Sequence, residues 1–519
     1  MVVYARYASN NDDIWMWLEI LKGNPITDGY RPNIGRFYPL AFADLNILMQ
    51  FFSSPYVFFG INALIVFCIG ILFWYMLDSV LGANQYMWLR ILLLIGVLLH
   101  PGFVTIMLSI CCPERLQVLF LLIFVAASFR FHIASKPHKT QYVAMIVGII
   151  AANLALYLKE PTFLFIGLFG FVNLIAALKD KHKNTAAIFY YATLLASVAV
   201  FLALYMWLIY PNIIKAYGNL ILIDKVLHTI RGFINYSLND CFIVWLLLAL
   251  ALYRAYMLCI KRQTAYLFFD ALIFGGILYA IAFIVLGLFQ NYYLVPIYAM
   301  STSGALYFLF TLQYIKKIVF KLITAVCCVL FCINTLPMGI YTFTYFKTEG
   351  VKFHQSLAFI SSQAKQNPHI TLYFDGNGRS RAYNTWYWSH FMRYLYEVYG
   401  VSNFDVKVKD SDYPNMPKPY IDTSSPFSVY NNEEISIPQQ GDFIILNNAT
   451  FHYVDSAYLA NMAEQYDVVY RTQAFGIPYI ALKPIIKYIF TDISLLQQVA
   501  NNNNNIFKAP YFDYIYQVR

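Results

Sequence analysis

Two adjacent carboxylates stand near the start of the chain, in the stretch SNNDDIWMWLEI from Ser9 to Ile20. A carboxylate at a membrane surface can accept a proton from a sugar or lipid hydroxyl, so Asp12 and Asp13 are candidates for a general base. Asp is also a favourable N-cap, and the pair could instead cap a helix over Ile14–Leu21. The tryptophans that follow suit an interfacial anchor that would hold both carboxylates at headgroup depth.

Charged side chains recur at the ends of apolar segments farther along the chain. The stretch CCPERLQ carries Glu114 and Arg115, which could line a site or belong to an ordinary loop. The stretch YLKEPTF carries Lys159 and Glu160 in a connection so short that both must lie near membrane depth. Ionisable residues at that depth usually have a function or pair with each other, so the alternative to a site is a local ion pair.

Three further stretches hold candidate ligands for a phosphate or a sugar. Arg36 lies in an aromatic, polar segment and could bind a phosphate or face lipid headgroups. Arg231 lies in a long connection over residues 211–240, which could place cations over a phosphate or serve only as a linker. Tyr292, in FQNYYLVP, could stack on a sugar, although tyrosine is common wherever a protein meets the membrane interface.

Sequence signatures of several enzyme classes are missing from the chain. It has no GxSxG, HExxH or Walker motif and no Cys/His spacing typical of a zinc site. These observations disfavour hydrolases, zinc proteases and ATP-driven transporters. The formal charge of +9 comes without a basic stripe interleaved with aromatic residues, so we expect no nucleic-acid partner.

Apolar residues make up 60% and charged residues 12% of the 519-residue chain. A chain this apolar needs lipid as the solvent for much of its surface. Ten segments approach the length of roughly 17–25 residues that a membrane-spanning helix needs. In the second of them, His100-Pro101 predicts a kink beside a buried histidine. The ten segments are Tyr56–Leu77, Met87–Ile110, Leu116–Ile133, Tyr142–Leu158, Thr162–Leu178, Ala186–Tyr210, Cys241–Ile260, Ala265–Phe289, Tyr292–Tyr314 and Ile318–Thr342.

The distribution of basic residues predicts which loops lie on which side of the membrane. Lysine and arginine gather in alternate loops, for example around Lys136 and Lys181, and the positive-inside rule places these loops in the cytoplasm. The opening segment, the connections with Glu114 and Glu160, and the C-terminal region then lie outside. Acidic residues gather on the same outer face, although they contribute little to topology. Chemistry on that face is a reason for them to be there.

The last third of the chain has the pattern of a separate domain. Hydropathy falls from Lys347 onward, and strand patterns such as HITLYF and DFIIL alternate with helix patterns such as SAYLANMAEQY. This alternation predicts an extracytoplasmic α/β domain over residues 347–519, in which YDVVYRTQAFGIPYIALKP forms a hairpin. Residues 1–346 then form the transmembrane domain, and residues 1–53 form its first extracytoplasmic loop with interfacial helices.

The chain resembles the GT-C superfamily of membrane glycosyltransferases in several features. These are the pair Asp12-Asp13, the interfacial stretch to Leu48, the acidic connections at Glu114 and Glu160, the long loop at 211–240 and the α/β tail. Members of that superfamily have a multi-helix membrane domain and a long first outer loop with one or two acidic residues. They also have a transmembrane helix before that loop, for which MVVYARYAS is too short. With such a helix the chain would have eleven transmembrane helices, and without it ten.

The resemblance implies a sugar donor linked to a polyprenyl phosphate, and it suggests roles for the candidate residues. Asp13, with Asp12 as the alternative, would deprotonate the acceptor hydroxyl. The implied substrate-binding residues are Arg36, Glu114, Arg115, Lys159, Glu160, Arg231 and Tyr292. No residue is assigned to a metal. A divalent cation, Mg²⁺ or Mn²⁺, would join the site if the donor were a diphosphate, whereas cations of the protein could suffice for a monophosphate.

The sequence therefore predicts a polytopic α-helical membrane protein of the GT-C type, with ten to eleven transmembrane helices and a C-terminal extracytoplasmic α/β domain. We expect a hexosyl- or pentosyltransferase of the bacterial inner membrane, surrounded by membrane lipids, that glycosylates a glycan, lipid or protein acceptor of the cell envelope. The closest alternative enzyme is a polymerase or ligase for lipid-linked oligosaccharides, of the O-antigen type. The alternative from another class is a non-enzymatic polysaccharide or lipid transporter, although the chain shows no internal repeat and few charges near the bilayer midplane.

Overall fold

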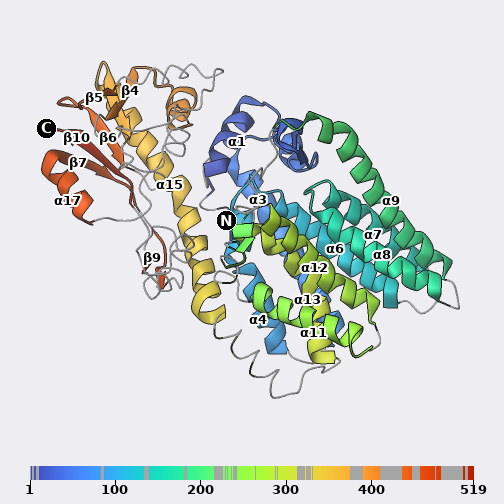
Figure 1. Ribbon diagram of the computed structural model, residues 1–519. Coiled ribbons are helices and arrows are strands. Elements are labelled where there is room, and N and C mark those ends of the chain that lie inside the picture. Colours follow the sequence, from blue (N-terminus) through green and yellow to red (C-terminus); the bar gives the residue numbers. More distant parts are fainter. Residues whose placement is uncertain are drawn as a thin grey trace. The chain divides into compact units, whose positions relative to one another are not determined.

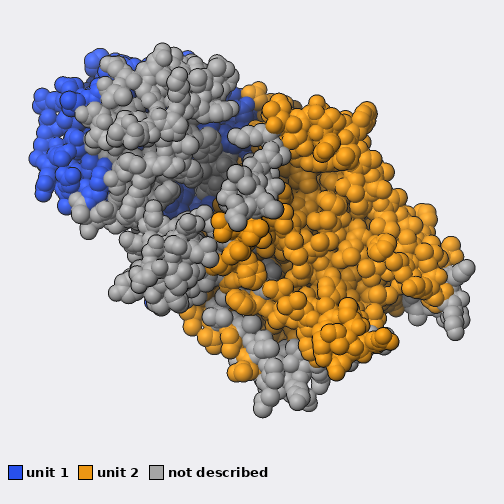
Figure 2. Space-filling view, in the orientation of Figure 1, with its two compact units in different colours: residues 1–22, 344–484, 500–519 blue, residues 23–343, 485–499 orange. Residues whose placement is uncertain are grey.

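The computed structural model contains two compact units (Figure 2). Unit 1 consists of Met1–Lys22, Thr344–Pro484 and Ala500–Arg519, and unit 2 consists of Gly23–Phe343 and Ile485–Val499. The first 22 residues, which we expected in the transmembrane domain, thus group with the C-terminal region. The residues that the structure describes are 2, 5–6, 11–82, 87–133, 139–180, 184–214, 226–227, 229–230, 232–234, 237, 242–262, 265–286, 288, 290–311, 322, 326, 329, 331–374, 390–409, 435–446, 456–473, 475–480, 507–508 and 512–519.

Unit 2 is a bundle of apolar helices (Figure 1). Among the described residues, seven helices are long and apolar enough to cross a membrane, or eight if the bent pair α4–α5 is one span. The chain is therefore a polytopic helical protein, as predicted. The main helices of unit 2 are α2 Ala43–Leu48, α3 Pro55–Leu81, α4 Met87–Leu98, α5 Pro101–Leu108, α6 Glu114–Ile133, α7 Lys139–Leu156, α8 Thr162–Lys179, α9 Thr185–Leu208, α11 Leu248–Cys259, α12 Leu267–Val285 and α13 Val295–Leu306.

The surface of these helices is apolar enough to require lipid. Phe67 of α3 is 64% exposed and Trp207 of α9 is 73% exposed, and many other large apolar side chains are exposed beside them. Contiguous apolar surface on this scale is rare on a protein that faces only water. The seventh predicted span consists of the short π-helix η4 Phe242–Leu247 and α11. The second half of the tenth consists of the π-helix η7 Phe331–Thr335 and the start of α15, whereas most of its first half lies outside the described residues. The count of ten to eleven spans stays a prediction.

The predicted kink at His100-Pro101 is confirmed. Helices α4 and α5 are bent by 55° at this break. Pro101 opens α5, where its missing N–H costs nothing, and Nδ1 of His100 caps the helix by accepting from the backbone N–H of Gly102 at 3.1 Å. His100 is fully buried and its ring packs edge-on against Tyr298.

Buried polar contacts tie the middle of the bundle together. The amide Nε2 of Gln117 donates to Oγ1 of Thr162 at 2.7 Å and to the hydroxyl of Tyr279 at 3.1 Å, which links α6, α8 and α12.

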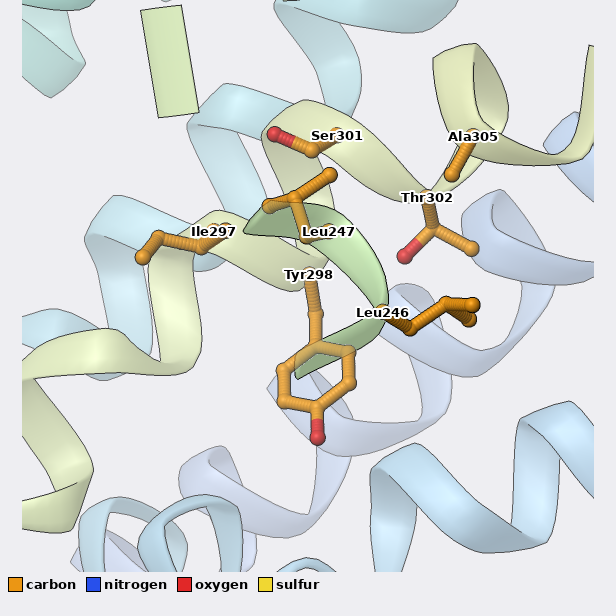
Figure 3. Close-up of a pocket in the computed structure, with 7 residues that line it drawn as sticks. All are labelled: Leu246, Leu247, Ile297, Tyr298, Ser301, Thr302 and Ala305. Atoms are coloured by element: carbon orange, nitrogen blue, oxygen red, sulfur yellow. The ribbon is translucent and has the colours of Figure 1, made fainter. Parts of the chain in front are cut away.

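A small cavity of about 20 Å³ lies between η4 and α13, with Leu247 and Thr302 on its wall (Figure 3). It has room for about one water molecule. It is too small to hold a substrate.

Unit 1 contains a mixed sheet of six strands in the order β5-β4-β3-β6-β10-β7. Strands β5, β4, β3 and β6 run parallel, and β10 pairs antiparallel with both β6 and β7. The long helix α15 Leu336–Gln366 precedes the sheet and contributes Thr344–Gln366 to this unit. The strands are β3 Ile370–Phe374, β4 Phe404–Lys409, β5 Ile435–Ser436, β6 Phe443–Leu446, β7 Tyr466–Arg471 and β10 Tyr514–Val518.

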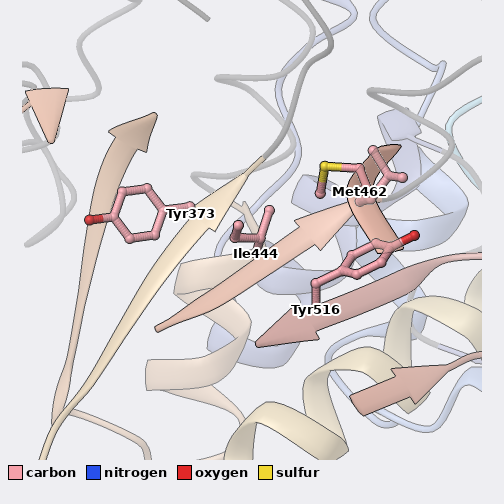
Figure 4. Packing of buried hydrophobic residues seen from close by; sticks show 5 residues of the cluster. Tyr373, Ile444, Met462 and Tyr516 are labelled. Atoms are coloured by element: carbon pink, nitrogen blue, oxygen red, sulfur yellow. The ribbon is translucent and has the colours of Figure 1, made fainter. Parts of the chain in front are cut away.

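Alternating side chains of β6 pack on opposite faces of the sheet, as the two-residue period of a strand requires. Phe443 contacts Phe359 of α15 on one face. Ile444 belongs to a buried cluster on the other face with Tyr516 of β10 and Met462 of α17 Ser456–Gln465 (Figure 4). Helices thus cover both faces of a predominantly parallel sheet, which is the α/β arrangement expected from the sequence.

The predicted hairpin over YDVVYRTQAFGIPYIALKP is wrong. Strand β7, which holds its first half, pairs with the C-terminal strand β10. Strand β8 Tyr479–Ile480, in its second half, pairs instead with β9 Phe507–Lys508. Two apolar runs separated by Gly476-Ile477-Pro478 look like a hairpin locally, but pairing with β10 gives β7 a longer register and a place at the edge of the six-stranded sheet.

The expected interfacial role of the first helix is also corrected. Helix α1 Asn11–Lys22 places Asp12 and Asp13 in its first turn, so neither aspartate precedes the helix as a cap. Trp17 is fully buried, so it cannot anchor the helix in lipid headgroups. Within unit 1, α1 contacts a helix over residues 390–397 through ion pairs and a hydrogen bond. These contacts are Lys22–Glu397 at 2.9 Å, Arg393–Glu19 at 3.2 Å and the Tyr394 hydroxyl to the carbonyl of Ile14 at 3.0 Å.

Candidate functional site

One end of the helix bundle in unit 2 collects buried and partly buried charges from three separate segments. We call this group the Lys159 cluster. It consists of Asp28, Arg36, Asp44, Glu114, Arg115, Lys159 and Glu160. Its segments are the loop before α3, the start of α6 and the connection between α7 and α8, and the sequence predicts all of them on the outer face.

Lys159 lies at the centre of the cluster, in the short connection over residues 157–161 that joins α7 to α8. Its Nζ is 2.8 Å from Oε1 of Glu114, the first residue of α6. The same Nζ lies over the rings of Tyr38 and Tyr293, at 5.1 Å and 4.9 Å from their centroids. Burial by itself would lower the pKa of Lys159, but Glu114 and the two tyrosines more than offset burial, and its pKa lies above the ordinary lysine value. Lys159 is therefore a permanent buried cation.

Glu114 is the most deeply buried carboxylate of the cluster, and like Asp44 it has no hydrogen-bond donor on either oxygen among the described residues. It is 1% exposed. Its contact with Lys159 is an ion pair through Oε1, so Oε2 is left without a donor. Buried carboxylate oxygens are almost always hydrogen-bonded, and one that is not calls for a ligand or a water. The position at the start of α6 also favours negative charge there.

A small hairpin positions the arginine side of the cluster. Strands β1 Tyr30–Arg31 and β2 Arg36–Phe37 pair through a turn in which Gly35 has a φ of +80°, a conformation that favours glycine. At Gly29 a Cβ atom would lie 2.4 Å from the carbonyl oxygen of Tyr38, so only glycine allows this close approach. The hairpin holds Arg36 2.9 Å from Asp28 and 5.8 Å from the Tyr38 ring that also faces Lys159.

Glu160 connects the hairpin to the helix bundle by a hydrogen bond. Its Oε1 accepts a hydrogen bond of 2.8 Å from the backbone N–H of Phe37. Burial raises the pKa of Glu160 above the ordinary carboxyl value, although Lys159 and the Phe37 N–H act in the opposite direction. Lys159 thus pairs with the distant Glu114, and the neighbouring Glu160 takes a separate role in holding the loop.

Arg115 anchors the third buried ion pair of the cluster. Its NH2 lies 2.6 Å from Asp44 of α2, and its NH1 donates to Oδ1 of Asn62 of α3 at 3.0 Å. The amide of Asn62 in turn donates to the carbonyl of Met107 at 3.3 Å. Arg115 therefore connects α2, α3 and α6 directly beside Glu114.

Aromatic rings form one wall of the cluster. Tyr292 and Tyr293 lie in the 3-10 helix η5 Asn291–Leu294, with ring centroids 4.4 Å apart. Tyr293 stacks on Phe283 of α12 at 4.8 Å with an interplanar angle of 14°. A fixed tyrosine pair next to a cation is a common platform for the apolar face of a sugar ring.

Six of the nine predicted site residues meet in this cluster or on its wall: Arg36, Glu114, Arg115, Lys159, Glu160 and Tyr292. Asp13 belongs to unit 1, where it is fully buried in α1. The side chain of Asp12 and all of Arg231 lie outside the described residues.

The sequence did not single out five residues that complete the cluster: Asp28, Tyr38, Asp44, Asn62 and Tyr293. A signal for two of them exists, because acidic residues gather on the predicted outer face and both Asp28 and Asp44 belong to that group. No motif or charge in the sequence distinguishes Tyr38 or Asn62 from the residues around them. Only the structure shows that Tyr38 faces Lys159 and that Asn62 accepts from Arg115.

The cluster does not have the composition of a divalent-metal site. Within the part of the chain that the structure describes, no three His, Cys, Asp or Glu side chains converge as metal ligands. Asp28, Asp44 and Glu114 each lie against a cation of the chain instead. The residues present thus do not fit Mg²⁺ or Mn²⁺, and any phosphate that enters would meet Lys159, Arg36 and Arg115.

Comparisons with known proteins return no match for this chain, whether against protein-family models, curated proteins or solved structures. The function therefore has to be argued from the residues of the cluster.

Proposed function

We propose that the protein is a membrane glycosyltransferase that moves a sugar from a polyprenyl-phosphate donor to a cell-envelope acceptor, with the Lys159 cluster as its reaction site. The observation that carries the proposal is the buried pair of Lys159 and Glu114, in which one carboxylate oxygen has no donor among the described residues. The outer face of a bacterial inner membrane and a count of ten to eleven spans belong to the same proposal.

The cluster has the groups that this transfer needs. A lipid-phosphate sugar already carries its leaving group, so the protein must supply a base for the acceptor hydroxyl and cations for the departing phosphate. Glu114 is a buried carboxylate at a helix N-terminus, and Lys159, Arg36 and Arg115 are cations beside it. The pair Tyr292 and Tyr293 offers a flat surface for the sugar.

The chemistry would proceed by an exchange of partners. Lys159 turns from Glu114 to an oxygen of the donor phosphate, which frees Glu114 to accept the proton of the acceptor hydroxyl. The acceptor oxygen bonds to the anomeric carbon while the bond from that carbon to the phosphate oxygen breaks. The bonding electrons leave with the polyprenyl phosphate, whose charge the cations stabilise. Asp13, the base implied by the resemblance, stays a prediction beside Glu114.

The test is transfer by the full chain in native membranes, supplied with tritiated polyprenyl-phosphate hexoses and pentoses. We expect Glu114→Gln to lower transfer at least about 100-fold, the range for loss of a general base. Glu464→Gln, an exposed carboxylate in α17, is the matched control and should transfer normally.

A parallel Asp13→Asn variant decides between the two candidate bases. Full activity of Asp13→Asn together with an inactive Glu114→Gln supports Glu114. The reverse result would return the base to Asp13 and leave Glu114 a structural residue. If no donor is consumed by the wild-type chain while a donor lipid crosses the bilayer, the protein is a transporter and the proposal fails.

A further inference from the structure

A cavity of about 400 Å³ lies at the opposite end of the same helix bundle, and the proposed transfer does not use it. Its wall comes from the end of α6, the start of α7, the end of α8 and the start of α12. Helix α8 begins beside Glu160 and contributes Asn173 and Asp180 to this wall. Because 18 helical residues span about 27 Å, the cavity is remote from the Lys159 cluster.

Two amide side chains on the wall have unused hydrogen-bonding capacity. Gln141 of α7 is 3% exposed, and its amide forms no hydrogen bond with any described residue. Asn173 of α8 is 4% exposed; its Nδ2 donates to the carbonyl of Phe169 at 2.8 Å, whereas its Oδ1 accepts from no described residue. Amide groups of this kind on a cavity wall can donate hydrogen bonds to a ligand and accept them from it.

Flat aromatic surfaces face the same space. Phe268 stacks on His132 with centroids 5.0 Å apart, and Tyr307 stacks on Phe269 at 3.7 Å with an interplanar angle of 10°. All four residues line the cavity. Rings held rigid by stacking offer apolar faces, while the amides offer donors and acceptors at their edges.

The described part of the wall is mostly uncharged. Asp180 is the single formally charged side chain among the described residues that line the cavity, and it is a carboxylate. These described residues include no lysine or arginine that could bind a phosphate. A cavity of this volume is within the usual range for a small-molecule site. The combination of neutral amides, aromatic faces and one acceptor carboxylate matches a group with many hydroxyls and an apolar ring face.

We propose that this cavity binds an uncharged sugar or polyol group, either as the headgroup of a glycolipid or free in solution. The hydroxyls would pair with Gln141, Asn173 and Asp180, and the C–H face of the ring would rest on Tyr307, which is only partly buried. This site is independent of the proposed transfer, because it contains no group that the reaction requires.

The test uses the full chain in phosphatidylcholine nanodiscs. Equilibrium dialysis with tritiated methyl glucoside, mannoside and galactoside measures binding of free sugars, and native mass spectrometry with monoglucosyl diacylglycerol measures binding of a glycolipid. Phosphatidylglycerol serves as the anionic comparison. We expect saturable binding of one glycosyl group in at least one presentation and no competition by phosphatidylglycerol.

Two variants challenge the cavity in different ways. Gln141→Leu removes the unpartnered amide at similar volume, and Ala177→Phe fills the space from α8. Each should weaken binding at least tenfold while keeping the wild-type unfolding temperature. The matched controls are Gln50→Leu, an exposed amide of the loop after α2, and Leu178→Phe, on the exposed face of α8. Both controls should bind as the wild type does.

Three results would overturn the inference. One is the lack of saturable binding by the wild-type chain in every presentation. Another is wild-type binding by both Gln141→Leu and Ala177→Phe. The third is displacement of the sugar by phosphatidylglycerol at equal affinity, which would make the cavity a site for anionic headgroups. Glu114→Gln should retain sugar binding, so failure of the proposed transfer and failure of this site can be told apart.

Discussion

Two lysines are almost completely buried, one in each unit, and their surroundings differ in one decisive respect. Lys352 of α15 lies 2.8 Å from Glu349, one turn earlier in the same helix, and 3.6 Å from Asp513. Lys159 lies 2.8 Å from Glu114 and faces two tyrosine rings. Nearby carboxylates raise the pKa of both lysines against the effect of burial, so both are cations.

The two lysines differ in how well the carboxylates beside them are hydrogen-bonded. Asp513 is held in place by the chain itself, because its backbone N–H donates to Oγ1 of Thr472 and its carbonyl accepts from the Thr472 N–H. Lys352 thus fastens α15 to the segment before β10. Neither Asp513 nor Glu349 has a buried carboxylate oxygen without a hydrogen-bond partner, whereas both oxygens of Glu114 lack a donor among the described residues. A fully compensated pair stabilises a fold, whereas an incompletely satisfied one can exchange its partner for a ligand.

The largest effect should come from breaking the compensated pair. We expect Lys352→Met to lower the free energy of unfolding of unit 1 by about 3–5 kcal/mol, because it leaves the buried Asp513 and the partly buried Glu349 without their cation. Hydrogen exchange of peptides from unit 1 in the full chain measures this loss. Lys365→Met, an exposed lysine of the same helix, should change stability by less than about 0.5 kcal/mol. Equal stability of both variants would show that Lys352 is not a fastener.

The second prediction distinguishes a catalytic role of Lys159 from a purely structural one. Lys159→Met should lower transfer at least about 100-fold, equivalent to about 3 kcal/mol, and should also destabilise unit 2. In the double variant Lys159→Met/Glu114→Leu, the buried charges are removed together, so stability should recover while transfer stays lost. Transfer rates and unfolding temperatures of the two variants decide the matter. Recovery of transfer in the double variant would make this pair as structural as that of Lys352.

The third effect is the acid sensitivity of unit 1. Burial, with a smaller contribution from Arg6, lowers the pKa of His354 to about 4. Since the folded pKa is below the unfolded value near 6.5, the stabilisation is present above pH 6.5 and is lost as the pH falls through 4. It amounts to up to about 3 kcal/mol. Hydrogen exchange of α15 across this window should show the loss. His354→Gln should flatten the profile, whereas His369→Gln, an exposed histidine beside Asp405, should leave it unchanged.

The smallest effect has the opposite sign and belongs to unit 2. Burial raises the pKa of Glu160, so the folded state holds its proton more tightly than the unfolded chain. Its stabilisation is therefore present below the ordinary carboxyl pKa and is lost as the pH rises through the raised value. Glu160→Gln keeps an oxygen for the Phe37 N–H and should remove this pH dependence, with a change of about 1 kcal/mol or less. A steeper profile in the variant would contradict this account of Glu160.

Much of the framework could be predicted because it depends on local properties of the sequence. Apolar runs of sufficient length become helices in lipid, and the break at His100-Pro101 follows from the missing N–H of proline. The alternation of basic loops grouped Glu114 with Lys159 and Glu160 at one end, and the structure brings these three residues together. The strand and helix patterns after residue 347 likewise predicted an α/β unit.

The partners of these residues could not be predicted from the sequence. Adjacent Lys159 and Glu160 suggest a local pair, yet Lys159 faces Glu114 and Glu160 holds the backbone of Phe37. An aromatic, amphipathic start suggests an interfacial anchor, yet Trp17 is fully buried and its helix belongs to unit 1. In each case the sequence shows which side chains are apolar enough to be buried and which are charged. Only the tertiary structure decided what each one meets, because hydropathy and spacing are local, whereas burial and ion pairing depend on segments that lie far apart in the chain.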